Sequence, residues 1–535
     1  MSDKLGYSWL MERYGVEPVQ PLPVSSEIGK VRRSVVVDGL QRDTYLPSSR
    51  PDKPSLAAHL TFALKHEGVH LELLARLFTV VPARELGEWI SAQSVGQYAR
   101  RAGFLYEWLT GRTLPGIADA TSGNYVDAID ADLYVTSTAP TNNSRWRVRD
   151  NLPGTRDFCP TIRRTPAVIA AESYNPAAEI ESLQIEYGTD ILLRSASWLT
   201  TKESRASFQI EQEQNQIDRI KRFAAVMERD CGEIPDVLSP ATLAKLQEDI
   251  IGGRTVLKQF GLRESPVFVG GVVDFRDQVD YIAPHFNDVA PLIKGLKEFV
   301  ERTKGASSLA RAAATSFSFV YIHPFADGNG RLHRFLLNDV LRRDGAVQRP
   351  FLLPVSATIV SRDQERAAYA GVLESFSKPL MARYRDAYEL VKPARIYSDG
   401  ISSNFEFAAY DDALPTWRYP DLTPHVAYVA TLVDKTIRHE MRNEASFLRS
   451  MTDARSAVKN VLDGPDPDID RIIRSVRESH GLLSNKLRKE FPMLADEAIA
   501  QDIVQAVTTA FATHQPQAMA TGTAKASDNE RSPAP

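Results

Sequence analysis

His323-Pro-Phe-Ala-Asp-Gly-Asn-Gly-Arg-Leu-His-Arg334 concentrates the chemistry of this chain into one short stretch. Before it, the apolar residues of 308–322 recur at helical spacing, which predicts a helix. Pro324 cannot continue that helix, because it has no N–H and disfavours helical backbone at the preceding residue. We therefore predict a helix that ends at His323, a loop, and a second helix over residues 331–342.

The loop has the composition of a phosphate site. Gly328 and Gly330 let backbone N–H groups turn inward, and the positive end of the second helix points at the same place. Asp327 is the only carboxylate of the loop and suits Mg²⁺ held against phosphate oxygens. Arg331 and Arg334 are three residues apart, so they share a helix face, and their guanidinium groups fit phosphate. The loop thus predicts a triphosphate site.

His323 stands at the start of this loop. An imidazole with an ordinary pKa of about 6.5 is the natural general base for a protein hydroxyl group. The competing interpretation is an ordinary glycine turn between two helices, with a structural histidine.

The stretch resembles the Fic family signature, HPFx[D/E]GN[G/K]RxxR, at every fixed position. This resemblance implies a helical core that transfers AMP from ATP to a Ser, Thr or Tyr hydroxyl of a target protein or of itself, with release of pyrophosphate. It implies that His323 is the base, that Asp327 binds Mg²⁺ and that Arg334 takes the γ-phosphate. Gly330 favours AMP transfer, because relatives with lysine there resemble the Doc type, which transfers a phosphate. The other implied nucleotide-site residues are Phe325, packed under the loop, and Gly328, Asn329, Gly330 and Arg331 on the phosphates.

A second motif lies upstream. Ser207-Phe-Gln-Ile-Glu211-Gln212 resembles the family's inhibitory pattern, [S/T]xxxE[G/N]. Glu211 would pair with Arg334 and occupy the guanidinium fork that the γ-phosphate needs. Gln212 departs from the pattern, which puts the tightness of the inhibitory turn in doubt. The competing interpretation is a solvated helix rich in glutamate, with Glu203, Glu211 and Glu213.

Residues 266–276, followed by Tyr281-Ile-Ala-Pro-His-Phe, have β-branched and aromatic runs around a Gly-rich centre, which predicts a hairpin. It resembles the Fic flap, whose edge adds a target segment as an extra strand, so Val267, Phe268 and Val269 are predicted to dock the target. The alternative is a plain surface hairpin. Tyr369, beyond the signature, is a candidate to line the nucleotide pocket.

Composition narrows the class of protein. A chain of 535 residues with 43% hydrophobic residues is long enough for several folded units. A formal charge of −4 predicts neither nucleic acid nor an anionic membrane surface as partner. Two cysteines make no disulfide framework, and no apolar run approaches the length of a membrane span. We expect a cytoplasmic protein with a protein target, and leave a homo-oligomer open.

The expected fold class is mainly α, with a helical Fic core, a β-hairpin flap, and helical regions before and after it. Helices are predicted over residues 56–77, 98–109, 424–448 and 468–488, with one short strand at 34–37. The expected divisions are a mostly helical N-terminal domain at 1–120, an ordered connector at 121–190, the Fic domain at 191–390, a helical region at 391–513 and a disordered tail at 514–535. Within the Fic domain we place the inhibitory helix near 203–216, the flap at 266–283 and the active-site loop at 323–334.

A competing enzyme class rests on His66-Glu-Gly-Val-His70, the HExxH pattern of zinc peptidases. Gly68 weakens the helix that would present both histidines, and no third ligand stands out. Further alternatives are a Fic-type transferase of another nucleotide, an enzyme that removes AMP, and a partner-binding regulator with a vestigial site.

Overall fold

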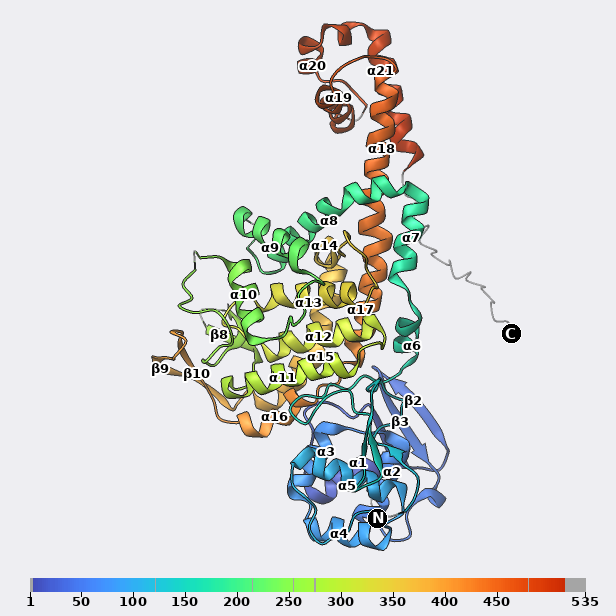
Figure 1. Ribbon diagram of the computed structural model, residues 1–535, viewed down its shortest axis with the longest axis vertical. Coiled ribbons are helices and arrows are strands. Elements are labelled where there is room, and N and C mark those ends of the chain that lie inside the picture. The colour runs from blue at the N-terminus through green and yellow to red at the C-terminus, as the bar shows by residue number, and fades with distance from the viewer. Residues whose placement is uncertain are drawn as a thin grey trace, which may run out of the picture. The chain divides into compact units, whose positions relative to one another are not determined.

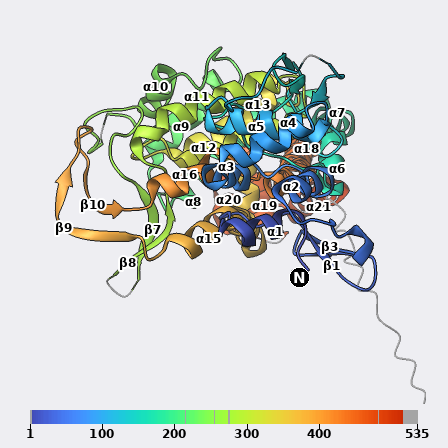
Figure 2. The ribbon, with the colours of Figure 1, turned by 90° about the horizontal axis from the view of Figure 1, so that it is seen from below.

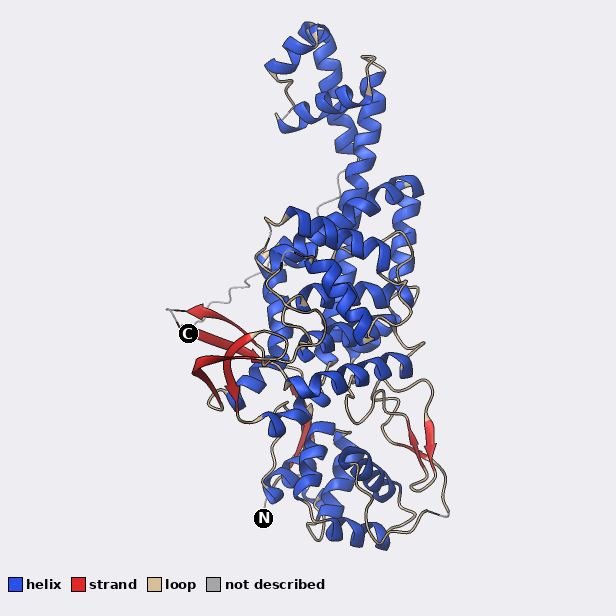
Figure 3. Cartoon of the chain, turned by 60° about the vertical axis from the view of Figure 1, so that its left-hand side comes forward, coloured by secondary structure: helices blue, strands red, loops and turns tan. Residues whose placement is uncertain are grey.

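The computed structural model describes residues 3–120, 122–213, 215–253, 255–273, 276–479 and 481–514. Helices dominate these residues and the strands form only small sheets (Figure 3), so the predicted mainly helical fold is confirmed. Apart from His514, the predicted tail at 514–535 lies outside the described residues. Among the described helices, none combines the length and the apolar composition needed to cross a membrane.

The chain forms two compact units. The first contains the chain up to Glu179 together with Ala196–Ile437, and the second contains Ile180–Ser195 and the residues from Arg438 onward. Residues of both units occur in α7 (Pro176–Tyr187), in α8 (Thr189–Ile210) and in the π-helical η3 (Thr436–Met441). The predicted active-site loop, flap and inhibitory motif all fall in the first unit.

The N-terminal part of the first unit packs helices around an apolar core and carries one small sheet. β1 (Val24–Ile28) pairs parallel with β3 (Leu40–Tyr45), which pairs antiparallel with β2 (Arg33–Val37). Only β2 was predicted, because β1 and β3 are polar and carry no alternating apolar pattern. The helical elements are α1 (Gly6–Tyr14), η1 (Pro47–Ser49), α2 (Leu56–Phe62), η2 (Ala63–Glu67), α3 (Leu71–Val80), α4 (Ala83–Ala92) and α5 (Gln97–Thr110).

The helical stretch predicted over residues 56–77 is present, but it divides at Gly68, with α2 and η2 before this glycine and α3 after it. This glycine has a φ of +87°, and a Cβ there would lie 2.2 Å from the Tyr134 hydroxyl oxygen. The backbone N–H of Val69 donates to that hydroxyl at 3.0 Å. A buried tyrosine from a distant segment therefore ends the helical run, which apolar periodicity alone could not reveal.

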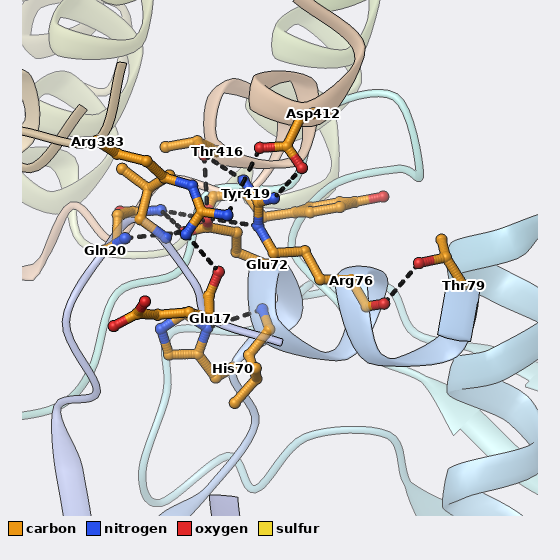
Figure 4. A network of polar contacts seen from close by, with 12 residues as sticks. Glu17, Gln20, His70, Glu72, Arg76, Thr79, Arg383, Asp412, Thr416 and Tyr419 are labelled. Atoms are coloured by element: carbon orange, nitrogen blue, oxygen red, sulfur yellow. Dashed lines mark hydrogen bonds and ion pairs between the residues drawn. The ribbon is translucent and has the colours of Figure 1, made fainter. Parts of the chain in front are cut away.

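Glu72 joins this N-terminal part to later helices of the same unit (Figure 4). Its buried carboxylate accepts hydrogen bonds from the Val19 N–H at 2.7 Å, the Arg76 Nε at 3.1 Å and the Thr416 hydroxyl at 3.0 Å. Arg76 also pairs with Asp412 at 3.0 Å. Because its partners include a cation and several donors, this buried charge is well compensated.

The segment predicted as a connector includes a second small sheet. β6 (Val148–Asp150) lies between β4 (Val126–Asp127) and β5 (Thr141–Asn143), and α6 (Pro166–Ser173) follows. Cys159 in this segment and Cys231 further on are free and buried. Burial raises the pKa of the Cys159 thiol to about 12.

A bundle of helices fills the rest of the first unit, with α12 and α13 side by side (Figure 1). α12 is buried on nearly every face, which explains its small and apolar sequence. The helices are α9 (Ile217–Asp230), α10 (Pro240–Ile251), α11 (Phe286–Arg302), α12 (Ser308–Ile322), α13 (Asn329–Arg343), α14 (Val355–Ser361), α15 (Asp363–Tyr384), α16 (Tyr410–Arg418) and α17 (Thr423–Lys435).

Two hairpins lie next to each other at one side of this bundle (Figure 2). The first pairs β7 (Phe268–Val273) with β8 (Arg276–Ile282), and the second pairs β9 (Tyr388–Ile396) with β10 (Ser402–Phe407). The rings of Phe268 and Phe405 join the hairpins, with centroids 5.0 Å apart. The first hairpin confirms the predicted β-hairpin of the fold class, although the glycines expected at its centre lie inside β7 instead of at the turn.

The second unit is helical. Its elements include α18 (Arg442–Lys459), α19 (Asp466–Glu478), α20 (Asn485–Glu490), η4 (Pro492–Ala495) and α21 (Glu497–Thr513), around a small core that contains Ile473, Leu494 and Ile503. The helix predicted at 424–448 corresponds to α17, the π-helical η3 (Thr436–Met441) and the first part of α18. The helix predicted at 468–488 is wrong in its length, because α19 ends at Glu478 and α20 begins at Asn485.

Candidate active site

The predicted loop connects α12 to α13. His323 caps the end of α12 with left-handed backbone, at φ 48° and ψ 59°. Gly328 precedes α13 with a φ of 95°, a conformation that glycine adopts without a Cβ clash. The loop therefore begins and ends on a left-handed residue, and this backbone returns the chain into a helix whose N-terminus faces the loop.

Buried side chains fix the conformation of the loop. The Asn329 amide accepts from the Phe325 N–H at 3.0 Å and donates to the Phe325 carbonyl at 2.9 Å. The Phe325 ring is fully buried against Phe319. Gln247 on α10 donates to the Asp327 carbonyl at 2.9 Å. Asn329, predicted on the phosphates, therefore uses both polar atoms of its side chain to fix the loop.

The ring of His323 has a defined proton position. Its Nδ1 lies 3.2 Å from the Val320 carbonyl, which can only accept, so Nδ1 carries the proton and Nε2 carries the lone pair. Burial, followed by the charge of Arg263, lowers the pKa of His323 to about 4. At neutral pH the imidazole is therefore uncharged, with Nε2 able to accept a proton.

Arg334 and Glu211 form an ion pair. Arg334 is 1% exposed, and its Nη2 lies 2.6 Å from the Glu211 Oε1. Its Nε donates to the Ser207 hydroxyl at 2.7 Å. Within the described part of the chain, Nη1 of Arg334 has no hydrogen-bond partner. Although burial acts in the opposite direction, Arg334 holds the pKa of Glu211 below its usual value.

The Glu211 carboxylate also lies over the first turn of α13. A Cβ built on Gly330 would be 2.1 Å from the Glu211 Oε1. The start of a helix attracts anions, because its first N–H groups are unpaired and its dipole is positive there. Glu211 thus places a negative group between the start of α13 and the buried guanidinium of Arg334.

A Schellman turn carries this carboxylate. The N–H of Glu213 bonds the Phe208 carbonyl at 2.8 Å and that of Gln212 bonds the Gln209 carbonyl at 3.1 Å. Gln212 has a φ of 60°, the left-handed position that glycine or asparagine fills best in such turns. The departure from the inhibitory pattern therefore falls on the one residue of the turn that prefers glycine.

The interpretation of residues 203–213 as a solvated glutamate-rich helix is wrong. Glu203 is fully buried on α8 and accepts from the Ser356 N–H at 2.7 Å and the Ser356 hydroxyl at 2.6 Å. Burial raises the pKa of Glu203 to about 7. Glu213 pairs with Arg331 at 3.2 Å. Helical periodicity places Glu203 and Ser207 on one face of α8, but a sequence with charges on every turn gave no sign that both side chains are buried.

Asp327 is the carboxylate available for a cation at the loop. Its side chain is 47% exposed, and its Oδ1 lies 2.9 Å from Nη2 of Arg331. The described residues contain no group of three or more His, Cys, Asp or Glu side chains arranged for a metal ion. One carboxylate suits Mg²⁺ that arrives with a nucleotide, because Mg²⁺ in such sites takes most of its ligands from phosphate and water.

The remaining predicted residues are Tyr369 and the three residues of the flap. Tyr369 on α15 is close enough to Arg334 for that charge to act on the phenol, although burial dominates and raises the pKa of Tyr369. In the flap, Phe268 pairs with Ile282, while Val269 pairs with Tyr281 and is 42% exposed. The Val267 carbonyl accepts from the Ala283 N–H at 3.2 Å, which closes the base of the hairpin.

The zinc peptidase interpretation is wrong. His66 lies in the π-helical η2, whereas His70 lies beyond Gly68 and caps α3 through its Nδ1, 3.2 Å from the Leu73 N–H. Glu67 is buried and accepts from the Tyr7 N–H at 2.7 Å. The two histidines therefore do not share a helix face, and the glutamate has a structural partner.

Part of the first unit is similar to a known protein family. Residues 237–341 match the model of the Fic/DOC family. These residues include the active-site loop and the first hairpin but not Ser207–Gln212.

Curated relatives cover short parts of the chain. A protein adenylyltransferase of Caenorhabditis elegans is 26% identical over 152 residues, which are 28% of this chain and 28% of that protein. A probable protein adenylyltransferase of Aquifex aeolicus is 26% identical over 225 residues, 38% of this chain and 67% of that protein. Among solved structures, a Fic family protein from Desulfovibrio desulfuricans matches with a TM-score of 0.36 and 19% identity, covering 66% of this chain and 86% of that one.

Proposed function

Because residues 237–341 are a Fic domain, we propose that the protein transfers AMP from ATP to a hydroxyl group of a protein side chain, and that Glu211 holds this activity off. The observation that carries the proposal is the position of the Glu211 carboxylate, between Arg334 and the start of α13. A carboxylate and a phosphate seek the same donors. Similarity to proteins named adenylyltransferases supports AMP as the transferred group.

In the proposed reaction the target hydroxyl oxygen bonds to the α-phosphorus of ATP. The bond from that phosphorus to the bridging oxygen breaks, and pyrophosphate leaves with the electron pair. His323 accepts the hydroxyl proton at Nε2, which the Nδ1 contact to Val320 keeps unprotonated. The N–H groups at the start of α13 and the guanidinium of Arg334 hold the phosphates in line for attack. A Mg²⁺ ion bound by Asp327 and the phosphate oxygens would neutralise charge on the leaving group.

Glu211 would block this reaction by occupying the position of a phosphate. While the ion pair stands, Arg334 has only Nη1 without a hydrogen-bond partner in the described residues. A nucleotide that cannot reach Nη2 loses a charge-assisted hydrogen bond and its alignment. The activity is therefore released by any change that moves Glu211 out of the space over Gly330.

The first hairpin would bind the target. Val269 lies on β7 with an exposed side chain, and backbone pairing with an added strand gives affinity without demanding a particular sequence. Replacing residues 267–269 by Gly-Ser residues should impair modification of a target more than ATP binding, because glycine destabilises the extended edge. Equal loss of both would assign these residues to folding or to the nucleotide.

The decisive experiment compares the wild type with Glu211→Gly and with Glu211→Gly/His323→Ala, using α-labelled ATP and proteins of a cell lysate. We expect the single variant to label proteins and the double variant to label none while it still binds ATP. CTP, GTP and UTP tested in parallel identify the nucleotide, and loss of label from a pre-modified target detects removal of AMP. A Glu211→Gly protein that binds ATP but transfers no nucleotide contradicts the proposal.

A further inference from the structure

Arg263 is a buried cation between the active-site loop and the β7–β8 hairpin. The residue is 2% exposed, and burial lowers its pKa to about 10. Its four hydrogen bonds all go to backbone carbonyls. The main-chain N–H donates to Pro324 at 2.8 Å, Nε to His323 at 2.8 Å, Nη1 to Ser265 at 2.8 Å and Nη2 to Pro284 at 2.5 Å.

These carbonyls belong to the active-site loop and to the two ends of the β7–β8 hairpin. Ser265 precedes the hairpin and Pro284 follows it, so the guanidinium spans the hairpin's base. His323 stands at the start of the loop, and the contact of its Nδ1 with Val320 leaves the lone pair on Nε2. One planar group with donors in a fixed fork reaches all three carbonyls, which neither lysine nor glutamine can do with the same geometry.

We propose that Arg263 is a positioning residue of the transfer reaction, which fixes the backbone of His323 to both ends of the target-binding hairpin. This inference rests on the proposed function. A target segment paired with β7 would then present its hydroxyl group to Nε2 at a distance set by Arg263. Misplacement by about 1 Å can reduce such a reaction about a hundredfold, so a rigid connection between base and docking strand has kinetic value.

A second anchor supports the same segment from the other hairpin. Asp399, between β9 and β10, is 5% exposed. One of its oxygens accepts from the Glu264 N–H at 2.9 Å and from the Ser265 hydroxyl at 2.7 Å. The two residues that follow Arg263 are therefore held, and the backbone of this segment cannot shift without breaking these bonds.

Arg342 offers a matched control. This arginine in the last turn of α13 also donates to three carbonyls, those of Phe351, Cys231 and Pro350, at 2.8, 3.1 and 2.8 Å. Burial lowers its pKa as well. It contacts neither the active-site loop nor the hairpin in these bonds, so its replacement should cost stability without displacing His323.

The test uses the full chain with Glu211→Gly as the parent, and adds Arg263→Gln, the milder Arg263→Lys, or Arg342→Gln. For each protein we measure the melting temperature, the ATP affinity by calorimetry, kcat and KM for the target protein that it modifies, and the pH dependence of kcat. We expect both Arg263 variants to lower kcat about tenfold to a hundredfold at unchanged ATP affinity. We also expect Arg263→Gln to move the acid limb of the pH profile upward, because a cation near His323 is removed. Arg342→Gln should lower the melting temperature and leave kcat and the acid limb unchanged.

Three results would overturn the inference in different ways. If the parent transfers AMP and Arg263→Lys, folded by its melting curve, keeps the parental kcat, Arg263 has no positioning role. If kcat falls equally in the Arg342 variant, the effect is one of general stability. A parent that binds ATP without transferring AMP overturns the proposed function itself, and the role of Arg263 with it.

Discussion

Glu211 and Gly330 occupy complementary volumes: the carboxylate oxygen of one lies 2.1 Å from the point where the other would carry a Cβ. The absence of a side chain at position 330 is therefore what allows the carboxylate to reach Nη2 of Arg334. The inhibitory motif and the active-site loop are consequently not independent in sequence. A residue larger than glycine at 330 requires a different course for Glu211.

Releasing this pair should strengthen ATP binding. A hydrogen bond between charged groups contributes about 1.5 to 3 kcal/mol, so Glu211→Gly should tighten ATP binding about tenfold to a hundredfold. The gain should disappear in Glu211→Gly/Arg334→Ala, because the released guanidinium is what binds the nucleotide. Calorimetry on the three proteins measures the effect, and wild-type affinity in the single variant would mean that the pair does not compete with ATP.

Gln212→Gly should strengthen inhibition. A residue with a Cβ in left-handed backbone costs about 1 to 2 kcal/mol, so glycine at 212 should stabilise the turn and lower the wild-type transfer rate about fivefold. Gln209→Gly is the control, and it should raise the transfer rate instead of lowering it. Gln209 is exposed in the last turn of α8, where glycine destabilises the helix by about 1 kcal/mol. Basal labelling rates of both variants decide the matter. A fall in both would show that the turn does not control activity.

The transfer rate of the released protein should resist acid further than an ordinary histidine allows. The pKa of His323 is lowered to about 4, so the imidazole stays neutral and able to accept a proton well below pH 6.5. We expect kcat of Glu211→Gly to be flat from about pH 8 to pH 5.5 and to fall toward pH 4. Circular dichroism at each pH separates this loss from unfolding. If kcat were half-maximal near pH 6.5, His323 would be exposed to solvent instead of buried.

His59 should make stability depend on pH in the N-terminal part. Its buried ring stacks on Trp9 at 4.0 Å, its ring nitrogens have no partner among the described residues, and burial lowers its pKa to about 4. The unfolded chain binds a proton near pH 6.5 and the folded chain does not, so stability is lost as pH falls from about 6.5 toward 4. His59→Phe should remove this loss, gaining about 1 to 2 kcal/mol at pH 5 relative to pH 8. Urea unfolding at the two pH values measures the difference, and an equal change at both would exclude the linkage.

Asp327→Ala should weaken the binding of the Mg²⁺ that transfer requires, because it removes the one carboxylate of the loop. In the Glu211→Gly parent, the Mg²⁺ concentration for half-maximal transfer should rise and the rate at saturation should fall. Asp327→Asn is the matched variant, because an amide can still accept from Arg331 without attracting the cation. Titration of transfer against Mg²⁺ tests both, and an unchanged half-point in each would assign Mg²⁺ to other ligands.

The sequence predicted the helical fold class and the helix-loop-helix around His323, because glycine, proline and apolar spacing are local signals. It also suggested the pairing of Glu211 with Arg334, through resemblance to a known pattern, and the two side chains do lie 2.6 Å apart. Gly68 marked a weak point of the helix over residues 56–77, but local signals could not show that Tyr134, far along the chain, packs against this glycine.

Three buried polar residues near the site had no sequence signal. Glu203, Gln247 and Arg263 belong to no motif, and each acts through tertiary contacts with a backbone group. The roles of Asn329 and Gln212 could not be predicted from the sequence for another reason. A side chain that braces its own loop, or a backbone in left-handed conformation, is a matter of geometry that residue type alone does not fix.

The two native thiols also decide how motion of the hairpin can be followed. Cys159 and Cys231 are buried, and burial raises the pKa of each, so maleimide reagents meet little thiolate on the folded protein. A cysteine placed at the exposed Val269 would then take a fluorophore or spin label selectively in the otherwise unaltered chain. The distance between that label and a second label on the target would report strand addition in real time.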